Sequence, residues 1–154
     1  MSTDLHSKLA ERNLALPEVF APRANYVPFV QSGNLLFVSG QISQDANGLM
    51  TGKVGEDLSV EDGVKAAEAC ALSLLAQVGA ALDGDFSRLT RVVKLTAFVN
   101  SAPDFTQQPQ VVNGCSDLLV AVLGDAGRHA RSAVSAGALP LNVAVEIEGI
   151  FEIA

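Results

Sequence analysis

The sequence predicts an α+β fold in which two helices cover one face of a mixed β-sheet. The first observation is the order of the patterned segments: a hairpin, a helix, a strand, a second helix and two final strands. The second is the composition, which is 49% hydrophobic and only 18% charged over 154 residues. A small monomer has too little interior to bury that much apolar surface. We therefore expect one domain, spanning 1–154, whose second sheet face is covered by other copies of the chain.

The N-terminal third predicts a short helix and a hairpin. Residues 2–15 place leucines on one side of a helix, within an N-terminal extension that reaches about residue 20. An irregular connector, 17–22, leads to two strands at 25–30 and 34–39, which are separated by a Ser-Gly-Asn turn. The second strand is continuously apolar and should be central, with a bulge at Gly40.

The middle of the chain predicts two helices around a strand. Residues 45–57 are rich in Gly and Asp and indicate a surface loop. Ser59 then begins a helix with a capping box, and apolar residues recur at helical spacing as far as Gly84. A strand at 91–99 and a helix at 109–123 follow.

Two carboxylates lie in the second of the final strands, which we place at 131–136 and 142–153. Alternation puts Val145 and Ile147 on one side of the last strand and Glu146 and Glu148 on the other. The simplest interpretation is a solvated outer face. The functional alternative is a carboxylate in a subunit interface, where burial favours its protonated form and lets it activate or orient a water.

Arg131 begins the preceding apolar strand. Its planar guanidinium would grip a carboxylate with two parallel hydrogen bonds, although a surface salt bridge is the ordinary alternative. We treat His129 as a surface histidine. With His6, it gives no credible metal-binding set and no acid/base pair of the ribonuclease kind. The glycines match no phosphate-binding loop.

Composition also limits the partners. The net charge is −7, the ten basic residues form no run and Trp is absent, which argues against nucleic acid as the main partner. Cys70 and Cys115 are expected to be buried thiols. We predict no secretory signal and no membrane span, and hence a cytoplasmic protein.

Three segments carry a resemblance to a known family. They are NYVPFVQSGNLLFVSGQI at 25–42, RVVKLTAFVNSAPDF at 91–105, and ARSAVSAGALP with VAVEIEGI near the end. In combination they resemble the RidA/YjgF family of reactive enamine/imine deaminases. The chain is most similar to its longer branch, which carries the labels endoribonuclease L-PSP and translation initiation inhibitor. The resemblance covers about residues 25–153.

The resemblance implies a chorismate-mutase-like fold and a homotrimer with three clefts between subunits. It implies that Arg131 holds the carboxylate of a small substrate and that Glu146 positions the hydrolytic water. It also implies a cleft lined by further residues, namely Tyr26, Ser39, Gly40, Ala133 and Asn113. Ala133 stands where deaminases of the family commonly have a cysteine, whose usual contact is through its backbone. The loop before Asn113 is longer than in the family.

These residues together favour a deaminase that hydrolyses 2-imino or 2-enamino acids to 2-keto acids and ammonia without a metal or cofactor. The first alternative is a non-catalytic trimer that binds small carboxylates as a regulator, which needs Arg131 but no water-activating Glu146. A ribonuclease or translation inhibitor is a further alternative, with the acidic charge against it. A holdase-type chaperone and a purely structural trimer also stay open.

Overall fold

The computed structural model of the chain describes residues 2–19 and 24–154. Its main helices and strands, in chain order, are α1 Ser2–Ala10, β1 Phe29–Ser32, β2 Leu35–Ile42, β3 Gln44–Asp45, β4 Gly48–Leu49, α2 Val60–Ala81, β5 Leu89–Asn100, α3 Gln108–Leu123, β6 Ala130–Ala136 and β7 Val145–Ile153. Three single turns of 3₁₀ helix connect them, at Phe86–Arg88, Gly124–Gly127 and Pro140–Asn142.

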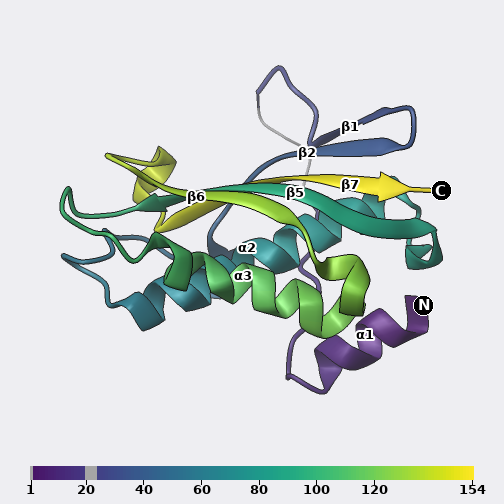
Figure 1. Cartoon of the computed structure of the whole chain (residues 1–154), viewed down its shortest axis with the longest axis horizontal. Helices are drawn as coiled ribbons and strands as arrows, with labels where there is room; N and C mark the ends of the chain where they lie inside the picture. The colour runs from purple at the N-terminus through teal and green to yellow at the C-terminus, as the bar shows by residue number, and fades with distance from the viewer. Residues whose placement is uncertain (1, 20–23) are drawn as a thin grey trace.

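Five strands form one mixed sheet in the order β1-β2-β7-β5-β6. Only β5 and β6 run parallel, and the other neighbours are antiparallel. Figure 1 shows α2 and α3 side by side beneath one face of this sheet, with α1 beyond α3. The predicted α+β class, with its mixed sheet and two helices on one face, is confirmed.

The core lies between these helices and the sheet. Ser59 caps α2 through the predicted capping box, in which its side chain accepts from the Asp62 N–H and Asp62 accepts from the Ser59 N–H. Small residues along α2, such as Ala67 and Ala71, are fully buried and let the helix lie close to the sheet. Val145 and Ile147 of β7 are also fully buried, so the predicted alternation of the last strand is confirmed.

The opposite face of the sheet lacks helices in the part of the chain that the structure describes. Val30 of β1 and Phe37 of β2 lie opposite each other there and are 53% and 42% exposed. Val134 of β6 pairs with Phe98 of β5 on the same face. This open apolar face is what led us to expect an oligomer, and the trimer stays a prediction.

Three local predictions were wrong in extent. The first helix ends at Ala10 rather than at residue 15, because a turn follows and Asn13 takes a left-handed φ of 58°. The first strand begins at Phe29, directly after Pro28, whose ring removes a hydrogen-bond donor. The segment 45–57 is not simply a surface loop: part of it forms the β3–β4 hairpin, and Val54 is fully buried. Of the connector 17–22, only Pro17, Glu18 and Val19 are among the described residues.

The expectation about membrane spans also needs correction. The 22-residue helix α2 is long and apolar enough to cross a membrane, with a mean hydropathy of 1.3 in its most apolar window. However, 67% of that window is buried inside the fold. Its apolar composition is explained by its place in the core.

Candidate functional site

Glu146 lies on the open face of the sheet, in the middle of β7. It stands opposite Phe98 on one neighbouring strand and opposite Ile42 on the other. The side chain is partly buried, and no Lys or Arg of the described residues lies within salt-bridge distance of it. Burial, and to a lesser degree the charge of Glu148, raises the pKa of Glu146 above its ordinary value.

The bulge in β2 makes the room for this carboxylate. The register between β2 and β7 shifts between Val38 and Gln41, as the sequence predicted for Gly40. A Cβ atom at position 40 would overlap Oε2 of Glu146 and lie 3.0 Å from its Cδ. Gly40 is therefore required by the close approach of the Glu146 side chain.

Arg131 lies on the other side of the sheet. It is the register partner of Leu95, which is fully buried beneath the helices, so the two side chains share the helix-covered face. Its Nη1 donates to Ser116 Oγ at 3.0 Å, and its Nη2 donates to the Pro109 carbonyl at 3.4 Å. Among the described residues, no carboxylate lies within 4.0 Å of this guanidinium.

A chain of hydrogen bonds holds Arg131. Ser116 Oγ, which accepts from Arg131, lies 2.9 Å from His129 Nε2. His129 Nδ1 lies 2.6 Å from the Gly127 carbonyl, which can only accept, so Nδ1 carries the proton and Nε2 accepts from Ser116. Burial, the largest cause, and the Arg131 charge lower the pKa of His129, against an opposing contribution from Gly127.

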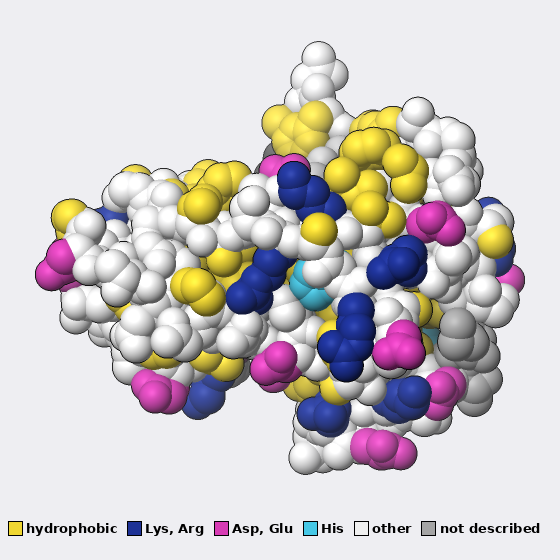
Figure 2. All heavy atoms as spheres, in the orientation of Figure 1, with side chains coloured by type: hydrophobic (Ala, Val, Ile, Leu, Met, Phe, Trp, Pro, Cys, Tyr) yellow, Lys and Arg dark blue, Asp and Glu magenta, His cyan; other side chains and the backbone are white. Residues whose placement is uncertain are grey.

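His129 is partly exposed, but the interpretation of it as a surface histidine missed the hydrogen bonds of both ring nitrogens. Its ring is partly buried and fixes the hydroxyl that supports Arg131. Figure 2 shows Lys and Arg side chains around a histidine, with Asp and Glu side chains among them, on a chain whose net charge is −7.

Two of the other predicted residues lie near Arg131. Asn113 is exposed on α3, on the same helical stripe as Pro109 and Ser116, both of which Arg131 contacts. Ala133 follows Arg131 on the same face of β6, opposite Ala97. This group presents a fixed guanidinium beside an exposed amide.

Tyr26, Ser39 and Gly40 line a cavity of about 800 Å³, and Gly40 also lies against Glu146. The walls of the cavity are the segment after α1, the end of β2 and one face of α2. Tyr26 is 58% exposed, and Ser39 Oγ donates to the Val27 carbonyl. Within one chain, the predicted site residues thus fall into two groups, one around Arg131 and one around Glu146 and Gly40, with Arg131 and Glu146 on opposite faces of the sheet.

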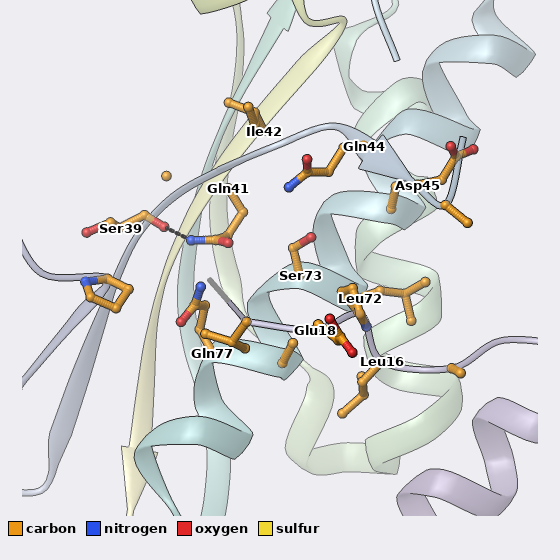
Figure 3. Close-up of a pocket in the computed structure, with 18 of the residues that line it drawn as sticks. Leu16, Glu18, Ser39, Gln41, Ile42, Gln44, Asp45, Leu72, Ser73 and Gln77 are labelled. Carbon is orange, nitrogen blue, oxygen red and sulfur yellow. Dashed lines mark hydrogen bonds between the residues drawn. The ribbon is translucent and has the colours of Figure 1, made fainter. Parts of the chain in front are cut away.

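Sequence reasoning missed the polar side chains inside this cavity. Gln41, Ser73 and Gln77 line it, together with Glu18 from the segment after α1 (Figure 3). A pattern pointed to two of them, because Ser73 and Gln77 stand four residues apart in an otherwise apolar helical run. Nothing in the sequence places the segment after α1 against them.

The thiols of Cys70 and Cys115 are buried and stay protonated at neutral pH. Both are free and fully buried, as predicted. Burial raises the pKa of Cys115 to about 12 and the pKa of Cys70 well above its ordinary value. In the described residues, no group of three or more His, Cys, Asp or Glu side chains is placed to hold a metal ion.

Comparisons with known proteins agree on one family. Residues 17–153 match the sequence model of the family described as Endoribonuclease L-PSP. The chain is 48% identical over 149 residues to "Protein TCP17" of Trypanosoma cruzi, which covers 96% of this chain and 92% of that protein. It is 49% identical to the crystal structure of Atu1372 from Agrobacterium tumefaciens, of unknown function, with a TM-score of 0.93 over 99% of this chain and 96% of the other.

A more distant structure contains a small ligand. The chain is 26% identical to E. coli TdcF with bound serine, with a TM-score of 0.59 over 90% of this chain and 94% of that one. Serine carries a carboxylate beside its amino group.

Proposed function

Because the chain belongs to the YjgF/RidA/L-PSP family and has its chorismate-mutase-like fold, we propose that it hydrolyses small 2-imino or 2-enamino acids to 2-keto acids and ammonia. The observation that carries the proposal is Arg131: a partly buried guanidinium held by two neutral acceptors, with no carboxylate among the described residues to neutralise it. Such a group is suited to the carboxylate of a ligand. The serine bound to TdcF is a ligand of that kind.

The proposed reaction uses two side chains. Arg131 binds the substrate carboxylate, and the ionised Glu146 accepts a proton from a water molecule. The water oxygen bonds to the imine carbon while the electron pair of the C=N bond moves to nitrogen, which takes the proton held by Glu146 to give a carbinolamine. The carboxylate then accepts the hydroxyl proton and passes it to the amino nitrogen, so the C–N bond breaks, ammonia leaves and the C=O bond of the keto acid forms.

The proposal requires more than one copy of the chain. Arg131 and Glu146 lie on opposite faces of one sheet, so one substrate cannot reach both in the same protomer. Arg131 belongs to β6, an edge strand of the sheet, where a second copy has access. We propose a homotrimer, whose contacts also cover the open apolar face around Val30 and Phe37.

The direct test is the release of ammonia and keto acid from imino acids that an amino-acid oxidase generates in situ. We expect the purified protein to raise the rate above spontaneous hydrolysis, in proportion to its concentration. The size of the assembly would be measured on the same sample by light scattering. The proposed reaction would be contradicted if the protein accelerated the hydrolysis of none of the imino acids in a panel with apolar, polar and charged side chains.

Gly40→Ala should damage this activity while leaving the fold intact. The added methyl overlaps Oε2 of Glu146, so the carboxylate must rotate away from its place. A displacement on the order of 1 Å is expected to lower kcat by about 10- to 100-fold. The measurement is imine hydrolysis, with circular dichroism to check folding.

Gly137→Ala is the matched control for Gly40→Ala. A Cβ at position 137 meets nothing within 4 Å, and its φ lies outside the left-handed region. This variant should keep wild-type activity. Equal activity in both variants would show that the close approach of Glu146 to Gly40 has no part in turnover.

The family description also names an endoribonuclease, but the described residues give no support for RNA cleavage. His129 is engaged on both ring nitrogens, by Gly127 and Ser116. The net charge of −7 opposes binding of a phosphate backbone.

A further inference from the structure

The cavity beside α2 is lined at one end by Tyr26, Ser39 and Gly40, which are predicted for the substrate cleft, but Arg131 and Glu146 are not among its described lining residues. Ala69, Ser73 and Gln77 of α2 form one wall of it, so it lies on the helix-covered side of β2. Glu146 lies on β7, where it pairs with Ile42 of β2 and approaches Gly40, and Arg131 lies on β6 at the far edge of the sheet. With about 800 Å³, the cavity is large enough for a small organic molecule.

One polar atom in the cavity lacks a partner. Gln77 is only 8% exposed, and its Oε1 is a buried oxygen with no hydrogen bond from the described residues. It is the one such side-chain atom found in that part of the chain. Leaving a buried carbonyl oxygen without a donor is unfavourable, so an atom of this kind in a native fold calls for an explanation.

The neighbouring amide does not satisfy this oxygen. Gln41 Nε2 donates to the Ser39 carbonyl at 2.9 Å, the bond drawn as a dashed line in Figure 3. Figure 3 shows Gln77 and Ser73 on the same side of α2, both directed toward the space between α2 and β2. The oxygen itself has almost no accessible surface, so a ligand N–H group in this space would supply the missing donor once the Gln77 side chain turns toward the cavity.

The charges around the cavity select the kind of donor. Glu18 and Asp45 are the charged side chains among its described lining residues, and both are acidic and exposed. The described lining contains no Lys, Arg or His. A carboxylate ligand would therefore be repelled, whereas a cation would be attracted.

The remaining walls are largely apolar. Leu16, Ile42 and Leu72 line the cavity from three different segments. They provide a surface for a short hydrocarbon chain, which gains by leaving water.

We propose that this cavity binds a small protonated amine with a short apolar chain. The ammonium group donates to Gln77 Oε1 and is attracted by the Glu18 carboxylate, while the hydrocarbon part packs against the leucines. This cavity thus binds a cation, whereas Arg131 binds an anion. Its proposed contacts, Gln77 and Glu18, take no part in the proposed deaminase reaction.

The test is titration of the full-length, isotope-labelled protein with isobutylamine and, separately, with isovalerate, which has the same branched chain with a carboxylate in place of the ammonium. The signals to follow in NMR spectra are the Gln77 side-chain amide and the Ser73 backbone amide. We expect isobutylamine to shift both signals in a saturable way, and isovalerate to bind there at least about tenfold more weakly.

Two variants show whether the named contacts carry the binding. Gln77→Leu should weaken isobutylamine about fivefold or more and also raise Tm, because it removes an oxygen that is unpaired in the free protein. Glu18→Gln should weaken isobutylamine and reduce the dependence of its affinity on salt. Arg131→Ala should leave isobutylamine binding unchanged, so that failure of this proposal and failure of the deaminase proposal can be told apart.

Three results would overturn the proposal. They are isovalerate binding as tightly as isobutylamine, isobutylamine binding that neither substitution weakens, and no saturable shift of the Gln77 and Ser73 signals with the amine.

Discussion

Replacing Arg131 by alanine is expected to lower kcat/KM for imine hydrolysis by roughly 10²- to 10³-fold. The guanidinium is already held by Ser116 and by the Pro109 carbonyl, so the substrate carboxylate meets a fixed donor pair. Losing one partner of such a charged pair leaves the other desolvated and unpaired. The measurement is the rate of keto-acid release at several substrate concentrations, which separates an increase in KM from a fall in kcat.

Two further substitutions make this prediction specific. Arg131→Lys keeps the charge but loses the planar fork, so its activity should lie between those of wild type and the alanine variant. Arg128→Ala removes a nearby arginine that is exposed and paired with Asp125, and it should leave kcat/KM unchanged. Full activity in Arg131→Ala on an authenticated imine would refute the role given to this residue.

Much of the fold could be predicted because its sequence patterns agree with one another. The capping box at Ser59 and the apolar spacing after it define α2, and the alternation around Val145 defines β7. The bulge at Gly40 was also predictable, since a glycine interrupts a strand there. These are local features, in which each residue reports on its own segment.

The placement of the site residues could not be predicted in the same way. Alternation indicates which side of its own strand a residue occupies, but it does not relate Arg131 on β6 to Glu146 on β7. Their opposite faces follow from the parallel register of β6 against β5 and the antiparallel register of β7. The partner of His129 was hidden for the same reason, because Ser116 approaches it only through the packing of α3.

The cavity shows a further limit of sequence reasoning. Gln77 looks like an isolated polar residue in an apolar helix, and its buried oxygen has no donor among the described residues although the Gln41 amide is nearby. Satisfaction of a buried polar group is a property of all its neighbours together. Whether a buried polar group is hydrogen-bonded can be judged only from the three-dimensional positions of its neighbours.

Glu146→Gln is expected to lower kcat for imine hydrolysis by about 10²- to 10⁴-fold, because the amide cannot accept a proton from water. The shape of the side chain is kept, so binding of the substrate carboxylate at Arg131 should persist. Keto-acid release measures the first effect, and calorimetric titration with a stable keto acid measures the second. A variant that keeps both turnover and binding would point to another base.

The pH dependence of this variant has a definite sign. The pKa of Glu146 is raised in the fold, so ionisation destabilises the folded chain once the pH passes above the ordinary value of 4.5. Below 4.5 the carboxyl is protonated in both the folded and the unfolded chain, and no difference remains. Glu146→Gln should therefore raise Tm at pH 7 and leave it unchanged at about pH 4, with a small effect because the group is partly exposed.

The neighbouring carboxylate supplies the matched control. Glu148 is exposed, and its charge contributes to the raised pKa of Glu146. Glu148→Gln should keep turnover at neutral pH and move the acidic limb of the pH–rate profile to lower pH, because Glu146 then ionises more readily. The wild type could also bind keto acids without hydrolysing any imine. In that case Glu146 has no catalytic role, and the chain is a small-carboxylate binder that uses Arg131 alone.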